Sequence, residues 1–221
     1  MTTEIVSPRQ TTAAARGIAS GASILFAVAL FASVASVGVP SDATDAELLA
    51  WWQDSGNQTA TLVSMFCAIT AAISFAAVAN HLRTLVSVGS GPHHLARFAH
   101  VMATAYTVTL LVTAAVRGVI GYQVKVAGEP VPDVSVLRYS TSLGYTLLDN
   151  VTMTTLALSI FTLSLAILKT GVLSRWVAIG GIACAVIITA AITATVGAFA
   201  IPLALLWAVG TAIAVWRPAA A

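Results

Sequence analysis

The chain is a series of long apolar segments separated by short polar ones. A helix needs about 20 apolar residues to cross the hydrocarbon of a bilayer, so each long segment is a candidate membrane span. The last two candidates divide one uncharged stretch, 176–216, which is too long for a single span; Gly197 and Pro202 are the local helix breakers, and the exact split is left open. The predicted spans are residues 17–39, 59–80, 95–122, 141–168, 174–194 and 198–216.

These segments favour helices over the strands of a membrane barrel. They are continuously apolar and lack the alternation of lipid-facing strands. A helix also satisfies its own backbone inside lipid. The first segment is too long for the apolar region of a typical cleaved signal peptide, so we expect it to be retained. The predicted fold class is therefore all-α: a polytopic helix bundle forming a single transmembrane domain over residues 1–221, with no repeat or second domain.

Composition narrows the class of protein further. Hydrophobic residues make up 58% of the chain, charged residues 8%, and the mean hydropathy is +0.94. Soluble domains carry about 25% charged residues. This composition excludes a soluble enzyme, a disordered chain and a nucleic-acid binder with a basic face. We expect the lipid bilayer as a partner and no nucleic acid, and we leave the oligomeric state open.

Lysine and arginine predict the orientation, because cytoplasmic loops are enriched in both. With both termini cytoplasmic, Lys125 and Arg138 lie outside and Arg117 lies within a span. The other basic residues, out of ten in all, then lie inside. We therefore expect a multi-pass protein of the bacterial plasma membrane. The inside basic residues are Arg9, Arg16, Arg83, Arg97, Lys169, Arg175 and Arg217.

The first outer loop, 40–57, predicts a short amphipathic helix on the outer surface. Residues 46–52 favour helix, and Ser41 or Asp42 is placed to cap it. Trp51 and Trp52 fit the aromatic belt at the headgroup level, which makes the helix an anchor. The alternative is a lid over an opening between spans.

Two ionisable residues, Arg117 and Asp149, fall well inside predicted spans. Such residues are costly in lipid and often mark function. Counted from the predicted outer ends, both lie roughly 8–12 Å deep in the same half of the bilayer. Their spans are joined by a short loop, so we expect an Arg117–Asp149 ion pair. A structural salt bridge, with Arg117 reaching the interface, is the alternative to a functional site.

Helical spacing adds polar neighbours to these two residues, because positions three or four apart share a face. We expect one pocket, with Asn150 and Tyr145 orienting the Asp149 carboxyl group and Trp207 closing the pocket from the last span. Its remaining lining is Tyr106, Thr113, Arg117, Ser142 and Thr152.

Metal and cofactor chemistry receives little support from the sequence. The four histidines, His81, His93, His94 and His100, gather near the inner ends of two spans but show no fixed ligand spacing. Whether they bind a metal is left open. No phosphate loop, cysteine-pair zinc motif or nucleophile elbow occurs. We predict no cofactor and no metal site.

Three segments resemble a set of uncharacterised actinobacterial multi-pass membrane proteins that are grouped as domains of unknown function. They are the acidic SDATDAELLAWW at 41–52, the basic NHLRTL at 80–85 and the turn LKTGVLSRWV at 168–177. This resemblance supports the topology and implies no activity. In size and all-helical architecture the chain also resembles small integral-membrane terpene cyclases, which protonate an alkene or epoxide with a buried carboxylic acid.

These observations lead to one expected function and two alternatives. The expected function is a membrane enzyme acting on an apolar, isoprenoid substrate, with Asp149 as the general acid of a protonation-initiated cyclisation. An ion pair with Arg117 would count against this role, because it would hold the acid ionised. The alternatives are a small proton- or cation-coupled transporter and a non-catalytic accessory protein.

Overall fold

The computed structural model describes residues 13–40, 42–88, 93–194 and 196–217, and all regular elements among them are helical. Six helices or helix combinations are long and apolar enough to cross a membrane, which confirms the predicted polytopic bundle. They are α1 (Ala13–Ala35), α3 (Ser55–Val88), α4 (His93–Lys125), α5 (Val134–Thr146) continued by η1 (Leu147–Thr152) and α6 (Met153–Thr170), α7 (Arg175–Thr193), and η2 (Gly197–Ala200) continued by α8 (Ile201–Trp216).

The predicted boundaries differ most at polar helix ends. Spans predicted at 59–80 and 95–122 extend to Ser55–Val88 and His93–Lys125, because their polar flanks continue the helix instead of ending it. Gly171 ends α6 with a φ of 67°, a left-handed conformation that favours glycine. The predicted split of the last apolar stretch is confirmed, since α7 ends at Thr193 and η2 begins at Gly197.

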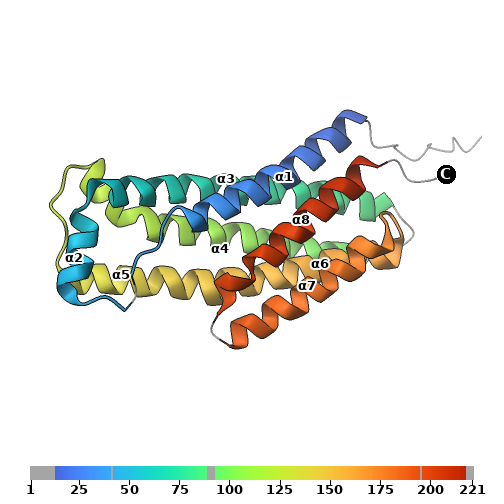
Figure 1. Ribbon diagram of the computed structural model, residues 1–221. Helices are drawn as coiled ribbons and strands as arrows, with labels where there is room; N and C mark the ends of the chain where they lie inside the picture. The colour runs from blue at the N-terminus through green and yellow to red at the C-terminus, as the bar shows by residue number, and fades with distance from the viewer. Residues whose placement is uncertain (1–12, 41, 89–92, 195, 218–221) are drawn as a thin grey trace, which may run out of the picture.

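The helices form one bundle in which α3 packs against α1 and α4, α6 packs against α4 and α7, and α1 packs against α8 (Figure 1). Its centre is an aromatic cluster around Phe75 of α3. The Phe75 ring lies 5.1 Å from that of Phe26, 4.5 Å from that of Tyr106 and 6.4 Å from that of Trp207, between ring centroids. Aromatic side chains from α1, α3, α4 and α8 therefore fill the middle of the bundle.

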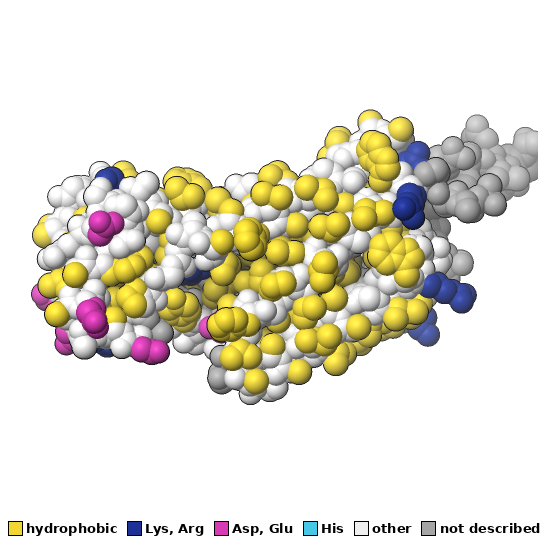
Figure 2. All heavy atoms as spheres, in the orientation of Figure 1, with side chains coloured by type: hydrophobic (Ala, Val, Ile, Leu, Met, Phe, Trp, Pro, Cys, Tyr) yellow, Lys and Arg dark blue, Asp and Glu magenta, His cyan; other side chains and the backbone are white. Residues whose placement is uncertain are grey.

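Charged side chains gather at the two ends of the molecule, and apolar ones cover the visible face between them (Figure 2). We call the end near α2 the acidic end; the opposite end, where α1 begins and α8 finishes, is the basic end (Figure 1). The acidic end carries Asp42, Asp45, Glu47, Asp54, Glu129 and Asp133, and the basic end carries Arg16, Arg83, Arg97, Lys169, Arg175 and Arg217.

The long helices project beyond the short ones at the acidic end. With 19 residues, α7 is about 28 Å long, close to the thickness of the hydrocarbon layer of about 30 Å. With 34 residues, α3 is about 51 Å long, and its extra length reaches past the α7–α8 turn toward α2 (Figure 1). The projecting parts of α3, α4 and α5 together with α2 form what we call the acidic-end cap.

The predicted outer-loop helix exists as α2 (Asp45–Gln53), but its capping residue and orientation differ from expectation. Thr44 caps it in a reciprocal capping box with Glu47; Asp42 does not, and Ser41 lies outside the described residues. Trp52 is 2% exposed, so its predicted place in a lipid-facing belt was wrong. Its ring belongs to a buried cluster with Leu48, Ile120 and Leu137, which holds the cap together.

Candidate functional site

Asp149 lies in η1, a π-helical interruption between α5 and α6. Such interruptions are frequent at functional sites. Its carboxylate Oδ1 accepts a hydrogen bond of 2.9 Å from the backbone N–H of Ala198, at the start of η2. The backbone of Gly197 lies so close that a Cβ there would be 2.3 Å from the Asp149 carbonyl oxygen. The acid is therefore tied to the turn between α7 and α8.

The lengths of the helices revise the expected depth of Asp149 in the membrane. Counted along α6 from Lys169, and along α4 from Arg97 to Arg117, each of the two ionisable residues lies about 20 residues, or roughly 30 Å, from the basic end. That is about one hydrocarbon thickness. The sequence predicts that the fourth span begins at 141, whereas α5 begins at Val134, within the acidic-end cap. A hydrocarbon layer with one face at Arg97 and Lys169 would therefore have its other face near Asp149 and Arg117.

A pocket of about 470 Å³ opens beside Asp149, and we call it the Asp149 pocket. Its wall along α5 and η1 carries polar groups, and its other residues come from α2, the segment before it, and η2. Of the residues predicted for a single pocket, it brings together Ser142, Tyr145 and Asp149. The complete lining is Pro40, Leu48, Arg138, Thr141, Ser142, Tyr145, Asp149 and Phe199.

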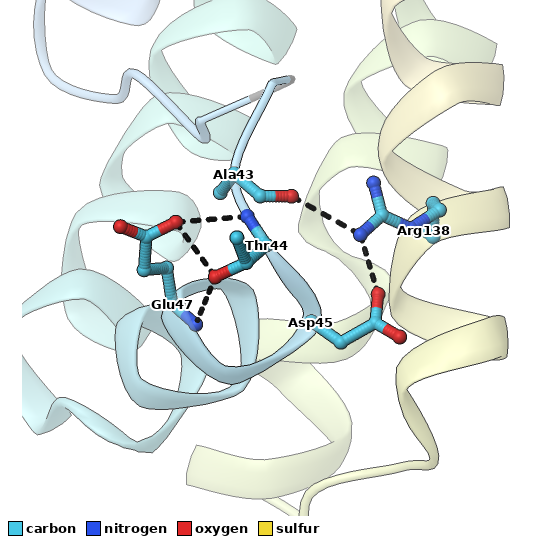
Figure 3. Close-up of polar contacts among 5 residues, drawn as sticks. All are labelled: Ala43, Thr44, Asp45, Glu47 and Arg138. Carbon is cyan, nitrogen blue, oxygen red and sulfur yellow. Dashed lines mark hydrogen bonds and ion pairs between the residues drawn. The ribbon is translucent and has the colours of Figure 1, made fainter.

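Polar contacts hold α2 and the segment before it against α5, and Figure 3 shows those made by Arg138. Arg138 of α5 forms an ion pair with Asp45 and donates a 3.1 Å hydrogen bond to the carbonyl of Ala43. The Tyr145 hydroxyl donates a 2.8 Å hydrogen bond to the carbonyl of Val39. The chain between α1 and α2 is thus held against α5, over the residues that line the pocket.

The predicted Arg117–Asp149 ion pair was wrong. The only ion pair within 4.0 Å among the described residues joins Arg138 and Asp45. Asp149 instead binds the Ala198 amide, and Arg117 packs against Gly144, where a Cβ would lie 3.0 Å from its Cγ. Arg117 lines a separate, smaller cavity that shares Thr141 and Tyr145 with the Asp149 pocket.

Four other predicted pocket residues hold helices together and do not line the Asp149 pocket. Thr113 and Thr152 are buried and share a 2.8 Å hydrogen bond between α4 and η1. Tyr106 is fully buried in the central aromatic cluster. Trp207 donates a 3.3 Å hydrogen bond to Ser164 in the core and does not close the pocket. These four residues differ from expectation because each side chain faces the axis of the bundle, nearer to the basic end than Asp149.

Asn150, the remaining predicted residue, is exposed and makes no hydrogen bond through its side chain to any described residue. Sequence reasoning missed five residues of the pocket: Pro40, Leu48, Arg138, Thr141 and Phe199. Arg138 and Thr141 precede Tyr145 at helical spacing, so the same-face rule that found Tyr145 would have found them. Phe199 gave no such signal, because it comes from a distant segment.

The histidine cluster stays without a demonstrated role. Among the described residues, no group of three or more His, Cys, Asp or Glu side chains is placed to hold a metal ion. The His93 side chain lies outside the described ones, His94 is exposed, and the buried Nε2 of His81 has no hydrogen-bond partner in the described part of the chain.

No protein-family model, curated protein or solved structure matches this chain. The function is therefore argued from the site itself.

Proposed function

We propose that this chain is a multi-pass protein of the bacterial cell membrane that binds a cationic amphiphile in the Asp149 pocket. The observation that carries the proposal is the Asp149 carboxylate on the pocket wall, about 20 residues along the helices from the basic end. Its Oδ1 is held by Ala198, and Oδ2 accepts no hydrogen bond from any described residue. An ammonium headgroup supplies the positive charge that such a carboxylate would attract.

The other pocket residues suit the two halves of an amphiphile. Tyr145 and Phe199 offer aromatic rings, whose faces attract organic cations. Leu48 and Pro40 offer apolar surface for the first carbons of a chain. Phe199 is 85% exposed at the edge of the pocket, where the rest of the chain would continue into lipid.

The charge of the surrounding end also favours a cation. Six acidic residues lie at the acidic end against two basic ones, Lys125 and Arg138, and the positive charge of Arg138 is paired with Asp45. A surface dominated by one sign of charge raises the local concentration of ligands of the opposite sign. Arg138 therefore does not prevent binding of an ammonium group deeper in the pocket.

General-acid chemistry on an isoprenoid is a narrower proposal for the same pocket. It needs aromatic faces around a developing cation. Of the three aromatic residues predicted for the pocket, Tyr106 and Trp207 lie in the bundle core, and only Tyr145 lines the pocket. Transport is also less favoured, since fully buried side chains such as Phe75, Leu110 and Met153 fill the bundle toward the basic end. The geometry favours binding.

Native mass spectrometry of gently extracted protein tests the proposal. We expect the wild type to bind one alkyltrimethylammonium ion in preference to an alkyl sulfate of the same chain length. Asp149→Asn should bind the cation at least about tenfold more weakly, because it loses a charge-assisted contact. Glu129→Gln, an equal charge change on an exposed residue outside the pocket, is the matched control and should bind as the wild type does.

Two results would overturn the proposal. One is equal cation binding by Asp149→Asn and the wild type, and the other is preference for the sulfate. An isoprenoid product carried by the wild type and changed in structure in Asp149→Asn would replace binding with general-acid chemistry.

A further inference from the structure

The smaller cavity beside Arg117 is a candidate ligand site in its own right. It measures about 20 Å³, enough for one water molecule or one small ion, since a single water needs about 10–15 Å³. It lies where α4, α5 and the projecting part of α3 meet the segment after α1 and Trp52 of α2. The cavity thus lies within the acidic-end cap and is partly open to its surroundings.

Three hydrogen-bond donors on the wall of this cavity have no partner among the described residues. Trp52 is 2% exposed, and its buried indole Nε1 donates to nothing. The buried Oγ1 of Thr141 is likewise without a partner. The Arg117 guanidinium makes neither a hydrogen bond nor an ion pair with any described residue, although it lines the cavity. A buried donor left unsatisfied costs about 1–3 kcal/mol, and a charged one costs more.

The other hydroxyl groups nearby are already engaged. Thr61 donates to the carbonyl of Gln58 at 2.7 Å, Ser64 donates to the carbonyl of Ser33, and Tyr145 donates to that of Val39 at 2.8 Å. Ser140 is the exception: its hydroxyl also lines the cavity and makes no hydrogen bond to any described residue. No carboxylate lines the cavity. Two of the free groups, the Trp52 indole and the Arg117 guanidinium, can only donate, and the guanidinium carries a fixed positive charge.

We infer that this cavity binds a single small anion of the size of chloride. Guanidinium and indole N–H groups can only donate, so their common ligand must accept hydrogen bonds. A water molecule would meet that need but would bring no negative charge to the partly buried Arg117 guanidinium, which has no ion-pair partner within 4.0 Å in the described part of the chain. A halide meets the donors and neutralises the charge. Asp149 does not line this cavity, so the inference does not use the proposed cation site, although the two cavities share Thr141 and Tyr145 and the charges of Arg117 and Asp149 act on each other.

Thermal unfolding of the solubilised protein in sodium chloride and in sodium gluconate of equal ionic strength tests the inference. We expect a saturable rise in Tm with chloride that gluconate does not produce. Trp52→Phe keeps the ring but removes the N–H donor, so it should weaken the apparent chloride affinity about tenfold or more. Arg117→Met should abolish the chloride response. Trp51→Phe is the matched control, since Trp51 is the neighbouring indole and does not line the cavity; it should respond as the wild type does.

A crystal of the wild type soaked in bromide gives a second readout that needs no variant. A single anomalous peak inside the cavity is the expected result. Equal Tm values in chloride and gluconate, a wild-type response in Trp52→Phe, or a bromide-free cavity would each overturn the anion site and leave a water molecule there.

Discussion

Asp149 owes its position to Gly197. The glycine backbone approaches the Asp149 carbonyl so closely that no side chain fits between them, and this approach lets the next amide, that of Ala198, reach the carboxylate. The acid is therefore positioned by a contact between η1 and η2, two short elements at the membrane boundary.

Replacing Gly197 with alanine should destabilise the protein. The added Cβ would lie 2.3 Å from a backbone oxygen that cannot turn aside, so η1 and η2 would have to separate. Overpacking of this kind costs about 1–3 kcal/mol, and a lower Tm of the solubilised protein would report it. Gly180→Ala is the control, because a Cβ at Gly180 meets nothing within 4 Å. An equal Tm in both variants would show that the close approach does not matter.

Part of the site could be predicted at this scale. Ser142, Tyr145 and Asp149 share one helix face by their spacing, and the pocket contains all three. The partner of Asp149 could not be predicted, because it is a backbone amide of another element. The predicted pairing with Arg117 failed for the same reason: opposite charges on neighbouring helices suggest a pair, but a helix terminus offers the acid a competing partner.

At the scale of elements, α2 depends on its capping box. Glu47 Oε2 accepts hydrogen bonds from the Thr44 hydroxyl at 2.7 Å and from the Thr44 backbone N–H at 2.8 Å. These two bonds hold the pKa of the Glu47 carboxyl below its ordinary value of 4.5, and the bond from the Thr44 hydroxyl has the larger effect. A carboxyl group with a lowered pKa stabilises the folded form above its ordinary pKa, and the stabilisation is lost as pH falls through the lowered value.

The amides of α2 should therefore lose protection from hydrogen exchange on acidification below about pH 4.5. In Glu47→Gln this pH dependence should be smaller, since the group that titrates is gone. Exchange measured by mass spectrometry, corrected for the intrinsic effect of pH, gives the comparison. Glu129→Gln should keep the wild-type pH dependence. The same loss of protection in Glu47→Gln and the wild type would rule out this role for the capping box.

The existence of α2 was predictable, but the surface it covers was not. Its helix-forming residues and acidic start are visible in the sequence. Two adjacent tryptophans suit a lipid interface and a buried contact equally well. Which of the two environments they occupy depends on the lengths of the other helices. Because α4 and α5 project at the acidic end, Trp52 packs against Ile120 of α4 and Leu137 of α5 and is buried.

At the scale of the whole molecule, unequal helix lengths determine where the site lies. The six spans were predictable because each is long and apolar. The projection of three of them was not, because the polar turns at their ends look like loops in the sequence. Because the short α7 matches the hydrocarbon thickness, we infer that Asp149 lies at the boundary of the bilayer and not, as the sequence predicts, in its interior. The proposed binding of a cationic amphiphile depends on that position.

Depth measurement by spin labelling in lipid vesicles tests this position most directly. Single labels would replace three exposed residues, Tyr139 in the cap, Asn150 beside Asp149, and Leu158 on α6, in a chain whose Cys67 and Cys184 have been replaced by alanine. Collision rates with oxygen and with a water-soluble nickel complex report the depth of each label. The account predicts that nickel reaches the label at 139 most, the label at 150 less and the label at 158 least. A label at 150 that is as shielded from nickel as the label at 158 would place Asp149 deep in lipid and contradict the account.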